Sequence, residues 1–184
     1  MKQVFLAAFA ALSLVSCNDA ATDTATTSND TANMSRNTDS KEVKEERNKQ
    51  TALASAKSFD NGGNADGAFK DADKDIVDYG DGSMAPIKGL DSVKAGLKMM
   101  LAAVPDWKGS DFMAVADGDY VMVYGTWSGT WKNDLMGMKP TGKSFKVKDV
   151  DIFKFNDAGK IIEHRSVQSM NEIARQTGMK MPNQ

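Results

Sequence analysis

The stretch DYVMVYGTWSGTW, residues 119–131, decides the fold, because valine, tyrosine, threonine and tryptophan dominate it as they do in β-strands. A preceding run, residues 112–116, ends at Asp117-Gly118, a dipeptide typical of tight hairpin turns. We therefore predict that the two runs pair as antiparallel strands. The segment Tyr120–Tyr124 is apolar on both faces, so we expect the second strand to be central and covered on each side.

A third strand is predicted in SFKVKDVDIFKF, residues 144–155. Its apolar positions change parity along the run, because Phe145 and Val147 are on odd positions whereas Ile152 is on an even one. We interpret this change as a β-bulge near Lys148-Asp149, which would bend the sheet.

The last strand, IIEHRSVQS, residues 161–169, must send alternate side chains to opposite faces. Arg165 and Ser169 share one face, and His164 lies on the other. We assign the face of Arg165 to an interior cavity, where a guanidinium needs a carboxylate from a ligand or from a neighbouring side chain. His164 is then predicted to point away from the cavity.

Helices are expected mainly before these strands. Apolar residues at helical spacing predict helices over residues 40–58, 65–73 and 90–104. A short helix over residues 170–177 should end at Gly178, which suits a C-cap. Helices followed by a meander of strands indicate an α+β fold, with a curved antiparallel sheet wrapped around the N-terminal helices.

Residues 1–17 are typical of an export signal, because Lys2 precedes an apolar run, residues 4–15, that is too brief to span a bilayer. The end of the signal, LVSC, resembles the bacterial lipoprotein signal. This resemblance implies lipidation of Cys17 and a lipid-anchored protein of the bacterial cell envelope, either a periplasmic or an outer-membrane lipoprotein. A cleaved secretory peptide is the alternative. Residues 18–39 are polar and predict a disordered linker, and residues 40–184 form one domain.

Composition excludes several classes of function. The formal net charge is −2, without the clustered positive face that nucleic-acid binding requires. The single cysteine, once lipidated, leaves none for disulfides or for catalysis. Asp71-x-Asp73-x-Asp75 begins like a calcium loop, but Ile76 and Gly82 replace the required glycine and glutamate. We expect no metal and no cofactor.

Five motifs follow one another in a fixed order within residues 41–178. They are VPDW at 104–107, GTWSGT at 125–130, KPTGK at 139–143, DIFKF with GKIIEH between 151 and 164, and QTG at 176–178. In this order and spacing they resemble the SnoaL-like polyketide cyclases of the nuclear transport factor 2-like superfamily. The resemblance implies a cone-shaped sheet around three helices, with a pocket at its open end.

The resemblance also implies where the proton-transfer residues of the cyclases would stand. An acidic residue near the end of the last strand moves protons for ring closure, and here that position holds Ser169. An aromatic residue four positions earlier corresponds to Arg165, and an acid–histidine pair in the early extended segment corresponds to Asp78-Tyr79. A serine hydroxyl with no evident base beside it is a poor acid or base, so the cyclase reaction is not expected.

Candidate site residues follow from side-chain chemistry. Large amphipathic rings suit flat apolar ligands, and Arg165 suits a carboxylate. The ligand-binding candidates are Tyr79, Trp107, Trp127, Arg165 and Ser169. If catalysis remains, Asp149, Asp151 or Tyr79 is the candidate acid or base.

Our leading hypothesis is therefore an exported, lipid-anchored domain that binds a small apolar or carboxylated molecule without transforming it. One alternative is a cyclase-like or isomerase-like enzyme with a relocated acid or base. Another is a structural module whose outer sheet face forms a homodimer. A carboxylate with a perturbed pKa that points into the cavity would favour the enzyme.

Overall fold

The computed structural model describes residues 27–167 and 170–180 of the chain. Its helices are α1 (Thr27–Lys57), α2 (Ala65–Ala68), α3 (Leu90–Ala103) and α4 (Met170–Thr177). Its strands are β1 (Ala72–Asp78), β2 (Ile87–Lys88), β3 (Lys108–Asp117), β4 (Tyr120–Thr130), β5 (Ser144–Phe155) and β6 (Ile161–Ser166).

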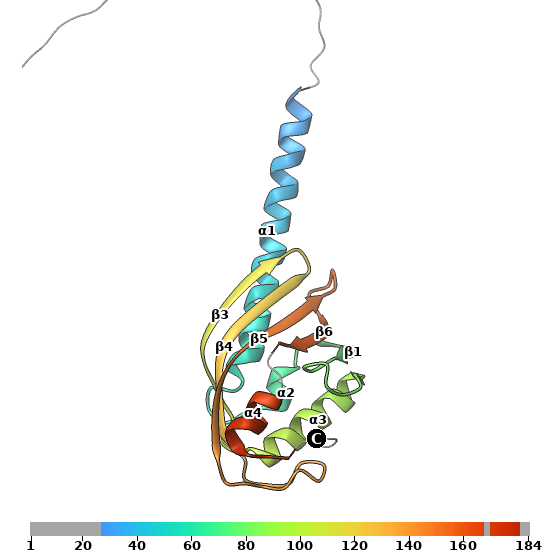
Figure 1. Cartoon of the computed structure of the whole chain (residues 1–184). Coiled ribbons are helices and arrows are strands. Elements are labelled where there is room, and N and C mark those ends of the chain that lie inside the picture. Colours follow the sequence, from blue (N-terminus) through green and yellow to red (C-terminus); the bar gives the residue numbers. More distant parts are fainter. Residues whose placement is uncertain (1–26, 168–169, 181–184) are drawn as a thin grey trace, which may run out of the picture.

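The strands form one six-stranded sheet in the order β2-β1-β6-β5-β4-β3. The pairs from β6 to β3 are antiparallel, as predicted, and β1 joins the far side of β6 as a parallel neighbour. Figure 1 shows β3, β4 and β5 as long, curved ribbons that bend around the helices. The predicted α+β class with a curved sheet around helices is therefore confirmed, with one parallel pairing added.

The helices pack on the sheet's inner face. α1 contacts β3 and β4, α3 contacts β1, and α4 contacts β5. Inward side chains of the strands and the packed face of α1 make a buried cluster that includes Ala52, Ile76, Val121, Phe153 and Phe155. A second buried cluster includes Trp131 together with Ile173 and Ala174 of α4. Burial of these apolar surfaces stabilises the curved sheet, and it leaves a hollow between α3, β1 and the centre of the sheet.

Strand β5 contains no bulge against β4. The pairing of β4 with β5 keeps one register from Tyr120↔Lys154 to Thr130↔Ser144. The prediction of a bulge near Lys148-Asp149 is therefore wrong. The odd positions of β5 face inward along its whole length, and the apparent change of parity arises because two of them are the carboxylates Asp149 and Asp151.

Strand β4 is central, but its outer face is open. The side chains of Tyr120 and Met122 are 45% and 46% exposed, whereas Val121 and Val123 are buried. The expectation that both faces are covered is therefore wrong for the described residues. Apolar residues on both faces of a strand indicate that at least one face is buried. They do not show that the same chain covers the other face.

Two other boundaries differ from the predictions. Residues 65–73 were expected to be helical, yet α2 ends at Ala68 because pairing with β6 recruits residues from Ala72 onward into β1. α1 begins at Thr27, so residues 27–39 of the predicted linker are helical, and no glycine or proline interrupts this run. The predicted signal, Cys17 and residues 18–26 lie outside the described residues. No helix within the described ranges is long and apolar enough to cross a bilayer.

Candidate functional site

A pocket of about 300 Å³ opens between α3, the β1–β2 connection and the inner face of β5 and β6. Its wall is mostly apolar, with aromatic rings and flexible methionines. The apolar lining residues include Phe59, Phe69, Met84, Ile87, Leu97, Met99, Met100, Trp107, Trp127, Leu135, Met136, Val147, Phe153, Met170 and Ile173. A pocket of this size and composition suits a small, mostly apolar molecule.

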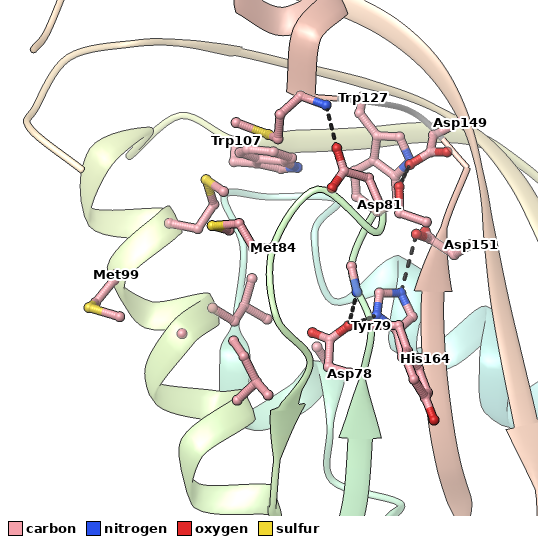
Figure 2. Close-up of a pocket in the computed structure, with 18 of the residues that line it drawn as sticks. Asp78, Tyr79, Asp81, Met84, Met99, Trp107, Trp127, Asp149, Asp151 and His164 are labelled. Carbon is pink, nitrogen blue, oxygen red and sulfur yellow. Dashed lines mark hydrogen bonds and ion pairs between the residues drawn. The ribbon is translucent and has the colours of Figure 1, made fainter. Parts of the chain in front are cut away.

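A histidine between two carboxylates forms part of the wall (Figure 2). Nδ1 of His164 lies 2.9 Å from Oδ1 of Asp78, and Nε2 lies 3.3 Å from Oδ1 of Asp151. The three residues come from adjacent strands, because β6 lies between β1 and β5. The side chains of His164, Asp78 and Asp151 are 17%, 20% and 12% exposed, so the ions are largely removed from water.

These contacts determine the charge of His164. Burial alone would lower the pKa of the imidazole, but hydrogen bonds and charge from Asp151 and Asp78 outweigh burial and raise this pKa from 6.5 to about 10. His164 is therefore an imidazolium at neutral pH. Burial would raise the pKa of Asp78, yet the bond to His164 and the backbone N–H of Gly80 lower it, so Asp78 is ionised.

Asp151 differs from Asp78 because fewer groups compensate for its burial. Desolvation raises the pKa of its carboxyl, and the contact with His164 only partly opposes this effect. The charges of Asp149 and Asp78 raise the Asp151 pKa further. Asp151 is thus a pocket carboxyl whose pKa lies above that of an exposed aspartate.

Asp149 lies one inward position before Asp151 on β5 and is held by the end of β6. Its carboxylate accepts a hydrogen bond from the Ser166 hydroxyl and another, of 3.1 Å, from the backbone N–H of Val167. Asp81, in the β1–β2 connection, accepts a 2.7 Å bond from the N–H of Met170, the first residue of α4. These bonds tie the β1–β2 connection, β5 and α4 around one cavity.

The structure brings five of the sequence candidates together. Tyr79, Trp107, Trp127, Asp149 and Asp151 all line the pocket. Ser169, the position that the family resemblance assigned to the proton-transfer acid, lies outside the described residues.

Arg165 is not in the pocket, so the prediction that it faces the cavity and that His164 faces away is wrong. The Arg165 side chain is 48% exposed, and its Nη2 lies 3.3 Å from Oε2 of Glu163. Its guanidinium carbon lies 3.8 Å from the centre of the Tyr79 ring. Alternation correctly predicts that the side chains of His164 and Arg165 lie on opposite faces of β6. The inner face, however, is the one on which His164 contacts Asp78 and Asp151, so the imidazole is the group that is enclosed.

Sequence reasoning missed the roles of His164 and Asp78, although a signal for the site was present. The odd positions Phe145, Val147, Phe153 and Phe155 of β5 are apolar, and Asp149 and Asp151 occupy the odd positions between them. Two carboxylates in phase with a buried apolar face indicate an internal polar site that requires a partner. The sole histidine of the chain is the natural candidate for that partner.

The charged residues of the pocket wall are Asp78, Asp81, Asp149, Asp151 and His164, and no lysine or arginine of the described part of the chain lines it. An anionic ligand would therefore meet excess negative charge. A neutral molecule with one polar group fits the wall better. Within the described residues, no group of three or more His, Cys, Asp or Glu side chains could hold a metal ion.

Comparison with known proteins agrees with this architecture. The family model described as SnoaL-like polyketide cyclase matches residues 50–177. A comparison with curated proteins finds no match.

Solved structures with the same fold include AclR from Streptomyces galilaeus, described as a candidate hydroxylase. It is 26% identical, with a TM-score of 0.60, over 76% of this chain and 85% of AclR. A candidate SnoaL-like polyketide cyclase from Jannaschia sp. CCS1 is 22% identical, with a TM-score of 0.63, over 75% of this chain and 95% of that one. IdmH from Streptomyces antibioticus, a candidate polyketide cyclase, is 22% identical, with a TM-score of 0.58, over 71% and 98%.

Proposed function

Because this chain belongs to the SnoaL-like polyketide cyclase family, a family with a ligand-binding fold, we propose that its pocket binds a small, mostly apolar carbonyl compound and moves a proton on it. The observation that carries the proposal is the environment of the Asp151 carboxyl. Its carboxyl lines an apolar pocket, has a raised pKa and contacts the imidazolium of His164. A carboxyl with a raised pKa is a stronger base than an exposed aspartate, and it can act as a general acid or base.

The proposed chemistry uses the three charged residues in distinct roles. The Asp151 carboxylate accepts a proton from the carbon next to the ligand's carbonyl, and it returns that proton at the end of the step. His164 donates hydrogen bonds through both ring nitrogens, so it orients Asp151 and offsets the negative charge that develops on the ligand. Asp78 holds the imidazolium in place, as a positioning residue. Enolisation of this kind is the first step of both isomerisation and aldol ring closure.

The ligand is proposed to be uncharged at its polar end. The expectation of a carboxylated ligand depended on Arg165 inside the cavity, and Arg165 lies outside it, paired with Glu163. The charged groups of the pocket wall are instead four aspartates and one histidine. A carboxylate placed there would lose its hydration without gaining a cationic partner of its own.

A second candidate function is binding without catalysis. It is favoured by the partners that the chain supplies to the charged residues of the pocket: both nitrogens of His164 have carboxylate partners, and Asp149 accepts bonds from Ser166 and Val167. A saturated network of this kind also occurs as a purely structural polar core. Proton exchange separates the two functions.

The test uses 1-tetralone, a flat neutral ketone, in D₂O at pH 7. We expect the native chain to speed incorporation of deuterium next to the carbonyl, and Asp151→Asn to reduce the enhancement by about 10²–10⁴-fold because general-base catalysis contributes that much. Exchange is followed by ¹H NMR, and binding by calorimetry. Asp75→Asn changes a residue whose side chain is 77% exposed and serves as the control.

The outcomes are distinct. Binding without exchange in the native chain would support the second candidate function. Equal exchange by the native chain and Asp151→Asn would remove Asp151 as the base.

The cellular setting is part of the proposal. The signal-like residues 1–17 support export, and Cys17 supports a lipid tether to a membrane of the bacterial cell envelope. Figure 1 shows the N-terminal part of α1 extending away from the sheet, as a tethered domain would require. Cys17→Ala should move the protein from the membrane fraction to the soluble one; retention in the membrane would contradict the tether.

A homodimer is also proposed, through the outer face of β3 and β4. Met113, Val115 and Met122 are 63%, 58% and 46% exposed there. Val115 pairs with Met122 and Met113 with Tyr124, so these apolar side chains form a continuous surface across two strands. Met122→Asp should convert a dimer to a monomer in light scattering, and a native chain that is already monomeric would contradict the proposal.

A further inference from the structure

The three tryptophans of this chain share one feature: their indole N–H groups are buried without a hydrogen-bond partner. Among the described residues, the Nε1 atoms of Trp107, Trp127 and Trp131 have this property. A buried donor without an acceptor carries an unfavourable free energy, and most native structures avoid it. Each of the three therefore requires a reason.

Two of these tryptophans are in the pocket and one is not. Trp107 and Trp127 line it, whereas Trp131, which is 0% exposed, belongs to the core below α4. Figure 2 shows the two pocket rings at the end of the cavity where Asp81 and Asp149 also lie. Trp127 is only 7% exposed, so its ring is almost entirely removed from bulk water although the residue lines the pocket.

The position of Trp127 is held by close packing. Its ring meets Phe59 edge-on at 5.1 Å between centroids and Phe112 at 5.4 Å. A Cβ on Gly109 would come within 2.8 Å of the indole, so the chain leaves out a side chain at the point where the ring lies. Trp107 is in turn packed against Phe145 at 5.3 Å. The two donors are thus fixed in direction before any ligand binds.

We propose that the indole N–H groups of Trp107 and Trp127 bind the carbonyl oxygen of the pocket's ligand. This assignment rests on the proposed function of the pocket and adds the ligand's recognition element: an uncharged acceptor oxygen on an otherwise apolar molecule. Neutral N–H donors suit this oxygen, because the carboxylates around it cannot donate when they are ionised. A carbonyl held by these donors is also polarised, which favours loss of the neighbouring proton to Asp151.

The direct test observes the three N–H groups by NMR. The whole chain, labelled with ¹⁵N-tryptophan, has three indole sites, and its cross-peaks are assigned with the Trp107→Phe, Trp127→Phe and Trp131→Phe variants. The probes are 1-tetralone and tetralin, which share a ring system and differ in the carbonyl. We expect 1-tetralone to move the Trp107 and Trp127 indole protons downfield relative to tetralin, and neither probe to move that of Trp131.

Affinity provides the second measurement. The native chain should prefer 1-tetralone to tetralin by about 30-fold in Kd, the amount that two net hydrogen bonds supply. Trp127→Phe should reduce this preference toward equality, and Trp131→Phe should retain it. If one variant fails to fold, the other two still assign all three cross-peaks of the native chain by elimination.

Three results would overturn the assignment. Equal affinity of the native chain for both probes would remove the acceptor recognition while leaving an apolar pocket, so the proposed function would survive. Persistence of the preference in both Trp107→Phe and Trp127→Phe would place the donor elsewhere. Failure of both probes to bind would contradict the assignment and the proposed carbonyl ligand together.

Discussion

His164 and Arg165 are consecutive residues of β6, and their side chains lie on opposite faces of the strand in different surroundings. His164 points inward, is 17% exposed, and lies between Asp78 and Asp151. Arg165 points outward, is 48% exposed, and contacts Glu163 on its own strand. Carboxylates from two other strands thus raise the pKa of the imidazole to about 10, whereas the guanidinium lies at the surface.

The difference shows how burial changes the consequence of an ion pair. At a solvent-exposed surface, an ion pair between a carboxylate and an arginine contributes little to the stability of the fold. In the pocket wall, removal of one partner leaves a charge without solvent, so the partners must be kept together. A group whose protonation depends on its neighbours is also one that a ligand can perturb.

Removal of the inward cation should have the largest effect. His164→Ala leaves Asp78 and Asp151 as neighbouring buried carboxyls without their shared donor, so we expect a loss of about 3 kcal/mol of unfolding free energy at pH 7. Urea denaturation followed by circular dichroism measures it.

The matched control is Asp75→Asn, whose side chain is 77% exposed, and it should change the unfolding free energy little. A loss below about 1 kcal/mol at pH 7 would mean that water already solvates the cluster.

Alkaline pH should have an intermediate effect. The His164 pKa is about 10 in the folded state and 6.5 without its partners, so the stability it contributes is complete below about pH 6.5 and is lost as the pH rises toward 10. We expect the difference in unfolding free energy between the native chain and His164→Ala to fall over this range. A difference that stays constant from pH 6 to pH 10 would show that the folded and unfolded pKa values coincide.

Removal of the outward cation should have the smallest effect. Arg165→Ala removes an exposed pair with Glu163 and a contact with the Tyr79 ring, which together contribute about 1 kcal/mol or less. The change should be seen in the urea midpoint, and ligand affinity should stay unchanged because Arg165 does not line the pocket. A large loss of affinity would show that the two faces are not independent.

Much of the fold was predictable because it depends on local patterns. Period-3.6 spacing located α3, Asp117-Gly118 located the β3–β4 turn, and Gly178 marked the end of α4, where its N–H bonds Ala174. Alternation also separated His164 from Arg165 correctly. These features involve residues close in sequence, so one chain segment contains all the information they need.

The site was harder to predict because it depends on which segments meet. Alternation states that two faces of β6 differ, but the choice of inner face depends on β1 and β5, which supply Asp78 and Asp151. The parallel pairing of β1 with β6 joins residues more than 80 positions apart and has no local signature. The indole groups of Trp107 and Trp127 likewise acquire their meaning only when the cavity between them is known.

The charge of His164 is measured most directly by an NMR titration of this residue, the one histidine of the chain, through its Cε1 proton. If His164 is an imidazolium enclosed by Asp78 and Asp151, its signal should stay constant from pH 5 to pH 8.5 and approach a midpoint only near pH 10. A full titration centred near pH 6.5 would show an ordinary, solvated histidine and would contradict the charged cluster on which the proposed proton transfer depends.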